Sequence, residues 1–431
     1  MYTFEKTLLV AIPGFTLLML IEYLYGLAKG RNTYANTADV VSSLSSGLTF
    51  VISNTLGFGA LVISYAWLSS LQFEATGSGE LGDIPIWVWL VTFIWVDFTG
   101  YWIHRWAHAN NFLWAMHMIH HSSEEFNLAV ALRQNAFKWF TYNGIMLAPL
   151  LLLKIPVEVL AIIVPVHLFM QFWYHTRHIG DLGVLEYLFV TPSQHRVHHA
   201  INQPYIDKNF GLIFSVWDRA FGSFQKELKE EPCAFGITVP VRNYNPVLIE
   251  LQYIGRMLRD SFYTKRWRDK FAVFFSRTGW RPADVAERFP YQKIEDCHNF
   301  EKYQPATPLW LQLWGVIQTL ITVALAAYLF QFIEFFTRQE LLMYVAIMLP
   351  GIYAATNQLQ NQSSIVAESI RLCLSLYVVY STGDWFMIAT KISNAHIVIL
   401  LVFAISWLLA IYLRLRQEAP SGSSTPTAPL V

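Results

Sequence analysis

The chain has 431 residues, of which 54% are hydrophobic, 16% aromatic and only 14% charged. A soluble domain usually carries about 25% charged residues, so this composition indicates a membrane protein. The formal net charge is zero and there is no basic stripe, which excludes the electrostatic footprint of a nucleic-acid-binding protein.

Apolar segments recur along the chain, and a helix needs about 20 such residues to cross the hydrocarbon core of a bilayer. They lie at 7–28, 45–67, 84–103, 135–155, 156–174, 308–335, 341–356, 365–388 and 395–413. We therefore expect an all-α, polytopic membrane helical bundle with about nine transmembrane or re-entrant helices. Only a tight turn at 154–156 separates the fourth segment from the fifth, so these two could form one re-entrant hairpin.

The charge of the connecting segments predicts the orientation. The loop at 68–83 has acidic residues but no Lys or Arg, whereas 104–138 and 175–305 hold most of the basic residues. By the positive-inside rule, the histidine-bearing segments face the cytoplasm. Localisation is expected in a bacterial inner membrane or the endoplasmic reticulum. The segment 218–305 is expected to form short helices that lie on the membrane face.

Histidines gather in one region: eleven of the thirteen lie between residues 104 and 199. Residues three and four apart share a helix face, so each motif can present two or three imidazoles to one locus. The motifs are His104-x3-His108, His117-x2-His120-His121 and His195-x2-His198-His199, with His167, His175 and His178 between the last two.

Eight imidazoles exceed the three or four that one zinc or iron ion takes, so two metal ions are the economical interpretation. Spacing alone does not name the metal. A nitrogen-rich site open to long apolar molecules suits oxidative attack on an unactivated C–H bond, which a metal and O2 must carry. Among the isolated histidines, His175 is a stronger candidate ligand than His167 or His178.

Asp97 precedes the first motif on the same helical stripe, seven residues before His104. A carboxylate inside an apolar helix is costly and by default indicates a functional site. We expect Asp97 to accept a hydrogen bond from a ligand histidine and to fix its tautomer.

Three histidine motifs of this form on a polytopic chain resemble the fatty acid hydroxylase / sterol desaturase superfamily of membrane non-haem di-iron enzymes. The stretches HRWAHANNFLWAMHMIHHSSEEFNLAVALRQ, QFWYHTRHIGDLGVLEYLFVTPSQHRVHHAINQPYIDKNFG and WDRAFGSFQKE are similar to the alkylglycerol monooxygenase branch, over about residues 90–225. More loosely, the resemblance takes in the hydrophobic C-terminal block.

This resemblance implies a fold and an activity. It implies two iron ions, O2 and a tetrahydropterin reductant, which together hydroxylate the carbon beside the ether oxygen of a glyceryl ether lipid taken from the bilayer. The domains would be 1–83, N-terminal transmembrane helices; 84–305, the catalytic domain; 306–416, C-terminal transmembrane helices; and 417–431, a disordered tail.

The resemblance also assigns residues. The histidine of the FWxHT stretch maps onto His175. Two positions depart from the pattern: Ala109 stands where the alkylglycerol enzymes carry an acidic residue, and Gln194 where a histidine often precedes the third motif. The eight motif ligands map onto His104, His108, His117, His120, His121, His195, His198 and His199.

Polar residues just after the motifs are candidates for supporting roles. Glu124 or Glu125 follows the second motif, and Asp207 with Asn209 follows the third. We expect these side chains to orient imidazoles or to hold a metal-bound water.

Other functions stay open at this point. Within the superfamily, the chain could be a sterol, carotenoid or fatty acyl hydroxylase or desaturase with a different electron donor. From other classes, it could be a metal or proton transporter with a histidine relay, or a non-catalytic membrane scaffold. A relay, however, uses a few spaced groups rather than HxxHH twice. The cysteines Cys233, Cys297 and Cys373 form no CxxC pair, which argues against disulfides and thiolate metal sites.

Overall fold

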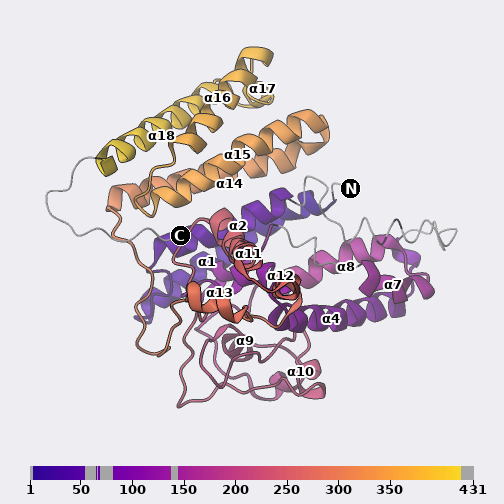
Figure 1. The fold of residues 1–431 in the computed structure, drawn as a ribbon. Helices are drawn as coiled ribbons and strands as arrows, with labels where there is room; N and C mark the ends of the chain where they lie inside the picture. Colours follow the sequence, from indigo (N-terminus) through magenta and orange to yellow (C-terminus); the bar gives the residue numbers. More distant parts are fainter. Residues whose placement is uncertain (1–2, 54–64, 66, 68–80, 137–143, 419–431) are drawn as a thin grey trace. The chain divides into compact units, whose positions relative to one another are not determined.

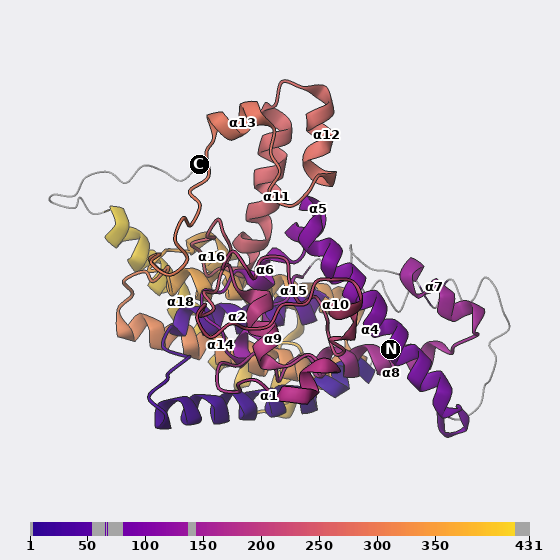
Figure 2. The same cartoon turned by 90° about the horizontal axis from the view of Figure 1, so that it is seen from below.

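The computed structural model describes residues 3–53, 65, 67, 81–136 and 144–418, and these parts contain helices and connecting loops but no strand (Figures 1 and 2). Two isolated bridges, Phe189 with Phe214 and Ala200 with Phe235, are the only β-type pairings there. The chain divides into two compact units. The first is Met1–Gln304 with Val323–Phe335, and the second is Pro305–Thr322 with Phe336–Val431.

The first unit contains two long apolar helices, α1 (Thr3–Ala28) and α4 (Ile86–Ala109). Helix α4 packs against α7 (Gly144–Leu152) and α8 (Val157–Phe169), which lie beside it in Figure 1. Their shared apolar core includes Val88, Leu150 and Leu160. This packing holds α4 in place, and α4 carries the first histidine motif at its C-terminal end.

Short helices carry the other motifs. Helix α6 is a single turn whose residues are all buried, and it packs through Met118 and Ile119 against Ile249. Proline at the first position of α9 suits a helix start, because that residue's N–H would lack an intrahelical partner in any case. The site elements are α2 (Thr37–Ser53), α5 (Asn111–Ala115), α6 (Met118–His121), η3 (Leu128–Leu132), η5 (Gly183–Tyr187), α9 (Pro192–His199) and α10 (Val216–Ala220).

Three further helices follow in the same unit: α11 (Pro246–Tyr263), α12 (Trp267–Phe275) and α13 (Ala283–Arg288). Helix α11 starts sharply because the Asn245 side chain accepts hydrogen bonds from the amides of Val247 and Leu248. Helices α11 and α12 form an antiparallel hairpin, which Figure 2 shows side by side.

The second unit is built from the first part of α14 (Leu309–Phe332) with α15 (Arg338–Gln358), α16 (Ile365–Thr382), α17 (Ile388–Lys391) and α18 (Ala395–Glu418). Its core contains a buried ion pair, in which Arg371 lies 2.5 Å from Glu368 and also donates to Gln318. A Cβ on Gly351 would lie 2.9 Å from an Arg371 nitrogen, so glycine is needed where α15 approaches this side chain.

Five helices in the described ranges are long and apolar enough to cross a membrane: Leu8–Ala28, Ile86–Ala109, Leu309–Phe335, Ile365–Thr382 and Ala395–Glu418. This supports an integral membrane protein, and these five helices correspond to five of the nine segments expected. The segment expected at 45–67 lies largely outside the described residues, as does the start of the one at 135–155.

Two other expected crossings differ for physical reasons. Helix α8 has only 13 residues, about 20 Å of rise, because the chain turns after Phe169 and carries His175 into the site. Helix α15 has 21 residues and is long enough, but polar residues at both ends, such as Glu340 and Gln358, lower its hydropathy.

Candidate metal centre

Nine histidines converge into two groups, in each of which one nitrogen of every residue lies within 4.8 Å of the others. All three motifs and the isolated His175 contribute, and all members are buried except the partly exposed His117. The first cluster is His104, His108, His117, His121 and His198. The second cluster is His120, His175, His195 and His199.

The motifs do not each serve one cluster, which corrects the sequence expectation. Residues four apart do stay together: His104 with His108 and His117 with His121 in the first cluster, and the pair 195/199 in the second. Histidines adjacent in the sequence belong to different clusters, as His120 and His121 do. The reason is helical geometry, because neighbouring side chains point about 100° apart whereas residues four apart share a face.

Within each cluster the Nε2 atoms point at one another. In the first cluster, His117 Nε2 lies 3.0 Å from the Nε2 atoms of both His104 and His121. In the second, His195 Nε2 lies 2.9 Å from that of His175 and 3.0 Å from that of His199. The clusters also adjoin, since the rings of His121 and His199 stack with centroids 4.3 Å apart.

In four of these histidines the opposite ring nitrogen is anchored to a backbone carbonyl oxygen, whereas Nδ1 of His195 is buried without a hydrogen-bond partner among the described residues. His104 Nδ1 lies 2.9 Å from the oxygen of Phe210, and His198 Nδ1 lies 2.9 Å from that of Lys208. A carbonyl oxygen only accepts, so each Nδ1 carries the proton and each Nε2 presents a lone pair. His120 and His175 are oriented in the same way by the carbonyls of Arg133 and Gln171, at 3.0 and 3.1 Å.

Burial keeps six of these imidazoles neutral. It lowers the pKa of His175 to about 3. Burial, followed by the charge that neighbouring imidazoles would carry, lowers the pKa of five others well below the ordinary value; these are His117, His121, His195, His198 and His199. These six rings are therefore unprotonated at neutral pH.

This donor set fits a metal cation. His120 and His175 both use Nδ1–H for a carbonyl, so their Nε2 atoms face each other at 3.4 Å with lone pairs only. Two such lone pairs repel unless a cation lies among them. Neutral imidazole with its second nitrogen hydrogen-bonded to a carbonyl is the form in which histidine binds metals.

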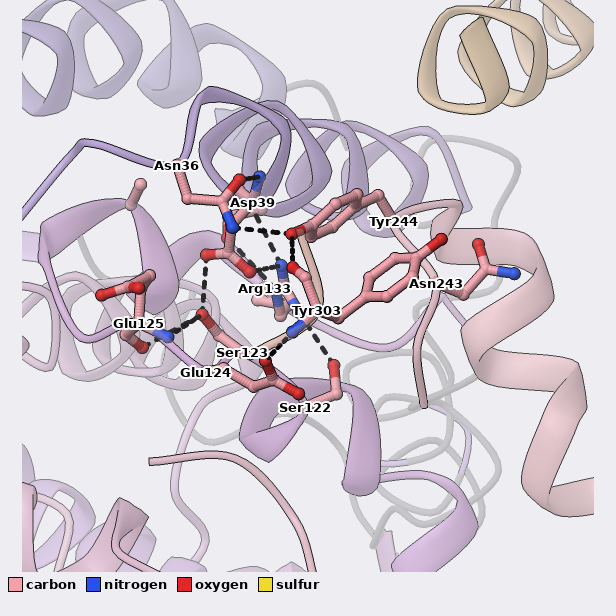
Figure 3. A network of polar contacts seen from close by, with 12 residues as sticks. Asn36, Asp39, Ser122, Ser123, Glu124, Glu125, Arg133, Asn243, Tyr244 and Tyr303 are labelled. Carbon is pink, nitrogen blue, oxygen red and sulfur yellow. Dashed lines mark hydrogen bonds and ion pairs between the residues drawn. The ribbon is translucent and has the colours of Figure 1, made fainter. Parts of the chain in front are cut away.

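A buried ion pair supports the second cluster (Figure 3). Arg133, whose carbonyl anchors His120, is fully buried. Its guanidinium donates to Asp39 at 2.8 Å and to the hydroxyls of Ser43 and Ser122 at 3.1 and 3.0 Å. Asp39 also accepts from Ser123 at 2.7 Å. The segment after the second motif is thus tied to α2, and the carbonyl that orients His120 is held in place.

Asp97 is placed differently from the expectation. It is fully buried, but the imidazole it contacts is His167, at 2.8 Å, which belongs to neither cluster. Its carboxylate also accepts from the amide of Ile213 at 2.9 Å and from the indole of Trp217 at 2.8 Å. Asp97 therefore ties α4 to α8 and to the loop after the third motif, which is why a carboxylate is tolerated inside an apolar helix.

The residues after the second motif do not touch imidazoles through their side chains. Glu124 accepts a hydrogen bond from the amide of Tyr303 at 2.6 Å, and burial raises its pKa. Glu125 forms ion pairs with Lys302 at 2.6 Å and with Arg177 at 3.5 Å. Both carboxylates therefore fasten neighbouring loops instead of orienting a ligand.

The residues after the third motif lie closer to the first cluster. Asp207 Oδ1 is 3.5 Å from His108 Nδ1. Asn209 makes no contact with an imidazole; its amide donates to the carbonyls of Gln194 and Gln225 and closes the loop. A cleft of about 220 Å³ opens beside these residues, lined by Arg105, His108, Ala109, Asp207, Lys208, Phe210, Gly222 and Ser223.

Two further carboxylates support the site and were missed from the sequence. Glu22, within α1, accepts from Tyr34 and Thr176 at 2.5 Å and from the amide of Leu128 at 2.8 Å, so it holds the residue next to His175. A charge inside an apolar helix, the signal applied to Asp97, could have identified it.

Asp218 is the second of these carboxylates. It accepts hydrogen bonds from the amides of Phe210 and Gly211 and from the hydroxyl of Ser223, each at 2.7 Å. It thereby fixes the carbonyl of Phe210 that anchors His104. Only its place in the WDRAFG stretch marked it in the sequence.

Comparisons with known proteins agree with this site. The fatty acid hydroxylase family model matches residues 89–223, which contain all nine clustered histidines. Alkylglycerol monooxygenase from Xenopus tropicalis is 32% identical over 375 residues, covering 84% of this chain and 80% of the relative. The Homo sapiens enzyme of the same name is 30% identical over 402 residues, with 92% and 87% covered.

More distant likeness extends to a lathosterol oxidase from Mus musculus, 27% identical over 38% of this chain and 56% of that protein. No solved structure matches the chain. Identity of at least 30% across most of both chains, together with the family match over the histidine motifs, leads to one conclusion. The chain belongs to the alkylglycerol monooxygenases of the fatty acid hydroxylase family, and it is an integral membrane oxidoreductase.

Proposed function

We propose that this protein cleaves O-alkylglycerol lipids by hydroxylating the carbon beside the ether oxygen, with two iron ions, O2 and a tetrahydropterin reductant. The observation that carries the proposal is the pair of adjoining clusters of neutral imidazoles, each with its lone pairs directed inward. The names of the relatives supply the substrate class.

The two clusters would hold one iron each, with nitrogen ligands from the first and second clusters as defined above. Bound iron supplies the activation of O2, which no amino-acid side chain provides. The carbonyl-anchored Nδ1 atoms keep four of the ligands in one tautomer, and the buried pair of Arg133 and Asp39 keeps His120 in place. Asp207 would orient His108 through its Nδ1.

One oxygen atom of O2 enters the C–H bond beside the ether oxygen, and the other leaves as water with two electrons and two protons from the tetrahydropterin. The resulting hemiacetal breaks its C–O bond to give a fatty aldehyde and a glycerol. The lipid would enter from the bilayer and the reductant from the cytoplasm, because the positive-inside rule predicts that the histidines face the cytoplasm.

The test is a lipid-substrate screen under O2 after anaerobic iron reconstitution, with and without tetrahydropterin. Ether cleavage that requires tetrahydropterin supports the proposal. Turnover of a sterol, carotenoid or fatty acyl chain only with a cytochrome or ferredoxin donor would assign the chain to another activity of the superfamily. Exchangeable zinc with transport activity would instead indicate a histidine-relay transporter.

Variants refine this screen. His120→Ala and His198→Ala remove one ligand from each cluster and should abolish ether cleavage. The matched control is His396→Gln, because His396 lies in the second unit and belongs to neither cluster. Full activity in His120→Ala would exclude the metal role proposed for the second cluster.

A further inference from the structure

The α11–α12 hairpin exposes apolar side chains where a water-facing helix would carry polar ones. In α12, Trp267, Phe271 and Phe275 follow one another at four-residue intervals and so share a face. Trp267 is 72% exposed and Phe275 76%. The opposite face packs inward through Val273. The outward side of α12 is therefore its aromatic side.

Helix α11 also exposes its apolar side chains and buries its ionic ones. Its exposed apolar residues Leu251, Leu258 and Phe262 lie on one face, together with Gly255. They share this face because the second and third of them follow Leu251 by seven and eleven residues, close to two and three helical turns. Ionic side chains of α11 point the other way: Asp260 is buried and pairs with Arg281 at 2.5 Å. Large exposed apolar patches of this kind mark contact with a membrane or a partner.

Unpaired positive charge borders the aromatic face. Lys265, Arg266, Arg268 and Arg277 are exposed, and none forms an ion pair within the described parts of the chain. The one acidic residue of this stretch is Asp269. Exposed aromatic residues beside lysine and arginine are the composition of a segment that lies in the interface of an anionic membrane.

Hydrogen bonds also tie the α11–α12 hairpin to the end of α4, at the level of the membrane surface. Helix α4 has 24 residues, a rise of about 36 Å, which exceeds the ~30 Å hydrocarbon core and leaves its end in the interface. Directly after that end, Asn110 donates to the carbonyl of Phe275 at 3.0 Å, and the amide of Asn111 donates to that of Ser276 at 3.0 Å. The C-terminal end of α12 is thus bound to the end of a membrane-spanning helix.

From these observations we infer that the α11–α12 hairpin is a membrane-docking element that inserts its aromatic face into the bilayer surface and recognises anionic phospholipid headgroups with Lys265, Arg266 and Arg268. The occupant is the lipid surface because the cations surround the apolar face and the tether sets its depth. This inference does not depend on the identity of the substrate.

Fluorescence quenching in nanodiscs tests it on the full-length protein. A single cysteine at Phe271→Cys, with the native cysteines replaced by serine, carries an environment-sensitive fluorophore, and nitroxide-labelled phosphatidylcholine is the quencher. The matched control is Glu287→Cys, an exposed charged position on α13. We expect quenching about twofold or more stronger at 271 than at 287, and stronger still when about a third of the lipid is phosphatidylserine.

Neutralising the cations tests whether they recognise anionic headgroups or whether the aromatic face only lies near the bilayer. Lys265→Gln, Arg266→Gln and Arg268→Gln together should abolish the phosphatidylserine dependence at position 271. Equal quenching at 271 and 287 overturns the inference, and a disulfide between two copies at 271 without quenching would assign the face to a dimer. If the variant in which serine replaces the native cysteines does not fold, amide hydrogen exchange of residues 264–276 is measured in the unmodified protein instead. Slower exchange in phosphatidylserine nanodiscs than in neutral nanodiscs supports docking. Equal exchange in the two refutes it.

Discussion

Replacing Arg133 by methionine should weaken the second histidine cluster selectively. The substitution removes an ion pair of 2.8 Å and hydrogen bonds to two serine hydroxyls. Among the described residues, it leaves the buried Asp39 carboxylate with Ser123 as its one side-chain donor. Removing one partner of a buried pair costs about 3–5 kcal/mol, because the other charge stays desolvated. The carbonyl that orients His120 then loses its support, which should lower metal affinity by about 10–100-fold.

The assay combines thermal unfolding in nanodiscs with iron titration of the metal-free protein. Wild type should take up about two irons per chain, and Arg133→Met about one at limiting iron. The double variant Asp39→Asn/Arg133→Met removes both charges and should recover about 2 kcal/mol relative to the single variant.

Arg371→Met is the control for this prediction, because it breaks a buried pair in the other unit and should destabilise the protein without changing iron affinity. Equal loss of iron from both clusters, or a double variant no more stable than the single one, would refute the reasoning.

Three other predictions concern single residues. His175→Ala should reduce bound iron from about two to about one per chain, measured by metal analysis, because it removes one of the four nitrogens of the second cluster. Asp218→Asn should lower the turnover number about 10–100-fold with little change in KM, since the anchor of His104 loosens while substrate contacts stay; an unchanged turnover number would contradict it. Burial raises the pKa of Glu250 to about 8, so folding favours its protonated form. Its stabilising effect is complete below the unfolded pKa near 4.5 and is lost as pH rises through about 8. Glu250→Gln should therefore flatten the pH dependence of the unfolding temperature between these values, and an unaltered slope would exclude this assignment.

The chemistry of the site could be predicted from the sequence better than its assembly. Histidine spacing and the resemblance identified all nine residues that converge, including His175. Helical spacing accounts for the separation of adjacent histidines in the second and third motifs, but it does not tell which histidines of different motifs meet, because the direction of the single-turn helix α6 depends on its packing against Ile249. Local periodicity does not encode that long-range contact.

The supporting residues show the same limit. Asp97 was recognised as a buried functional carboxylate, but its partner His167 comes from another helix and has no marker in the sequence. Asp39 and Arg133 are 94 residues apart, and neither lies in a metal motif. For the fold, hydropathy located the long apolar helices. At 156–174 it predicted an apolar segment longer than the 13 residues of α8, because a run of apolar residues does not reveal where this helix ends and the chain turns.

The separation of the two clusters has a covalent origin. His120 with His121, and His198 with His199, are consecutive residues that belong to different clusters. Consecutive Cα atoms are always 3.8 Å apart, so two peptide linkages hold the clusters at a nearly constant spacing. The distance between the two histidine clusters is therefore set within α6 and α9 themselves and does not depend on the lengths of the long apolar helices.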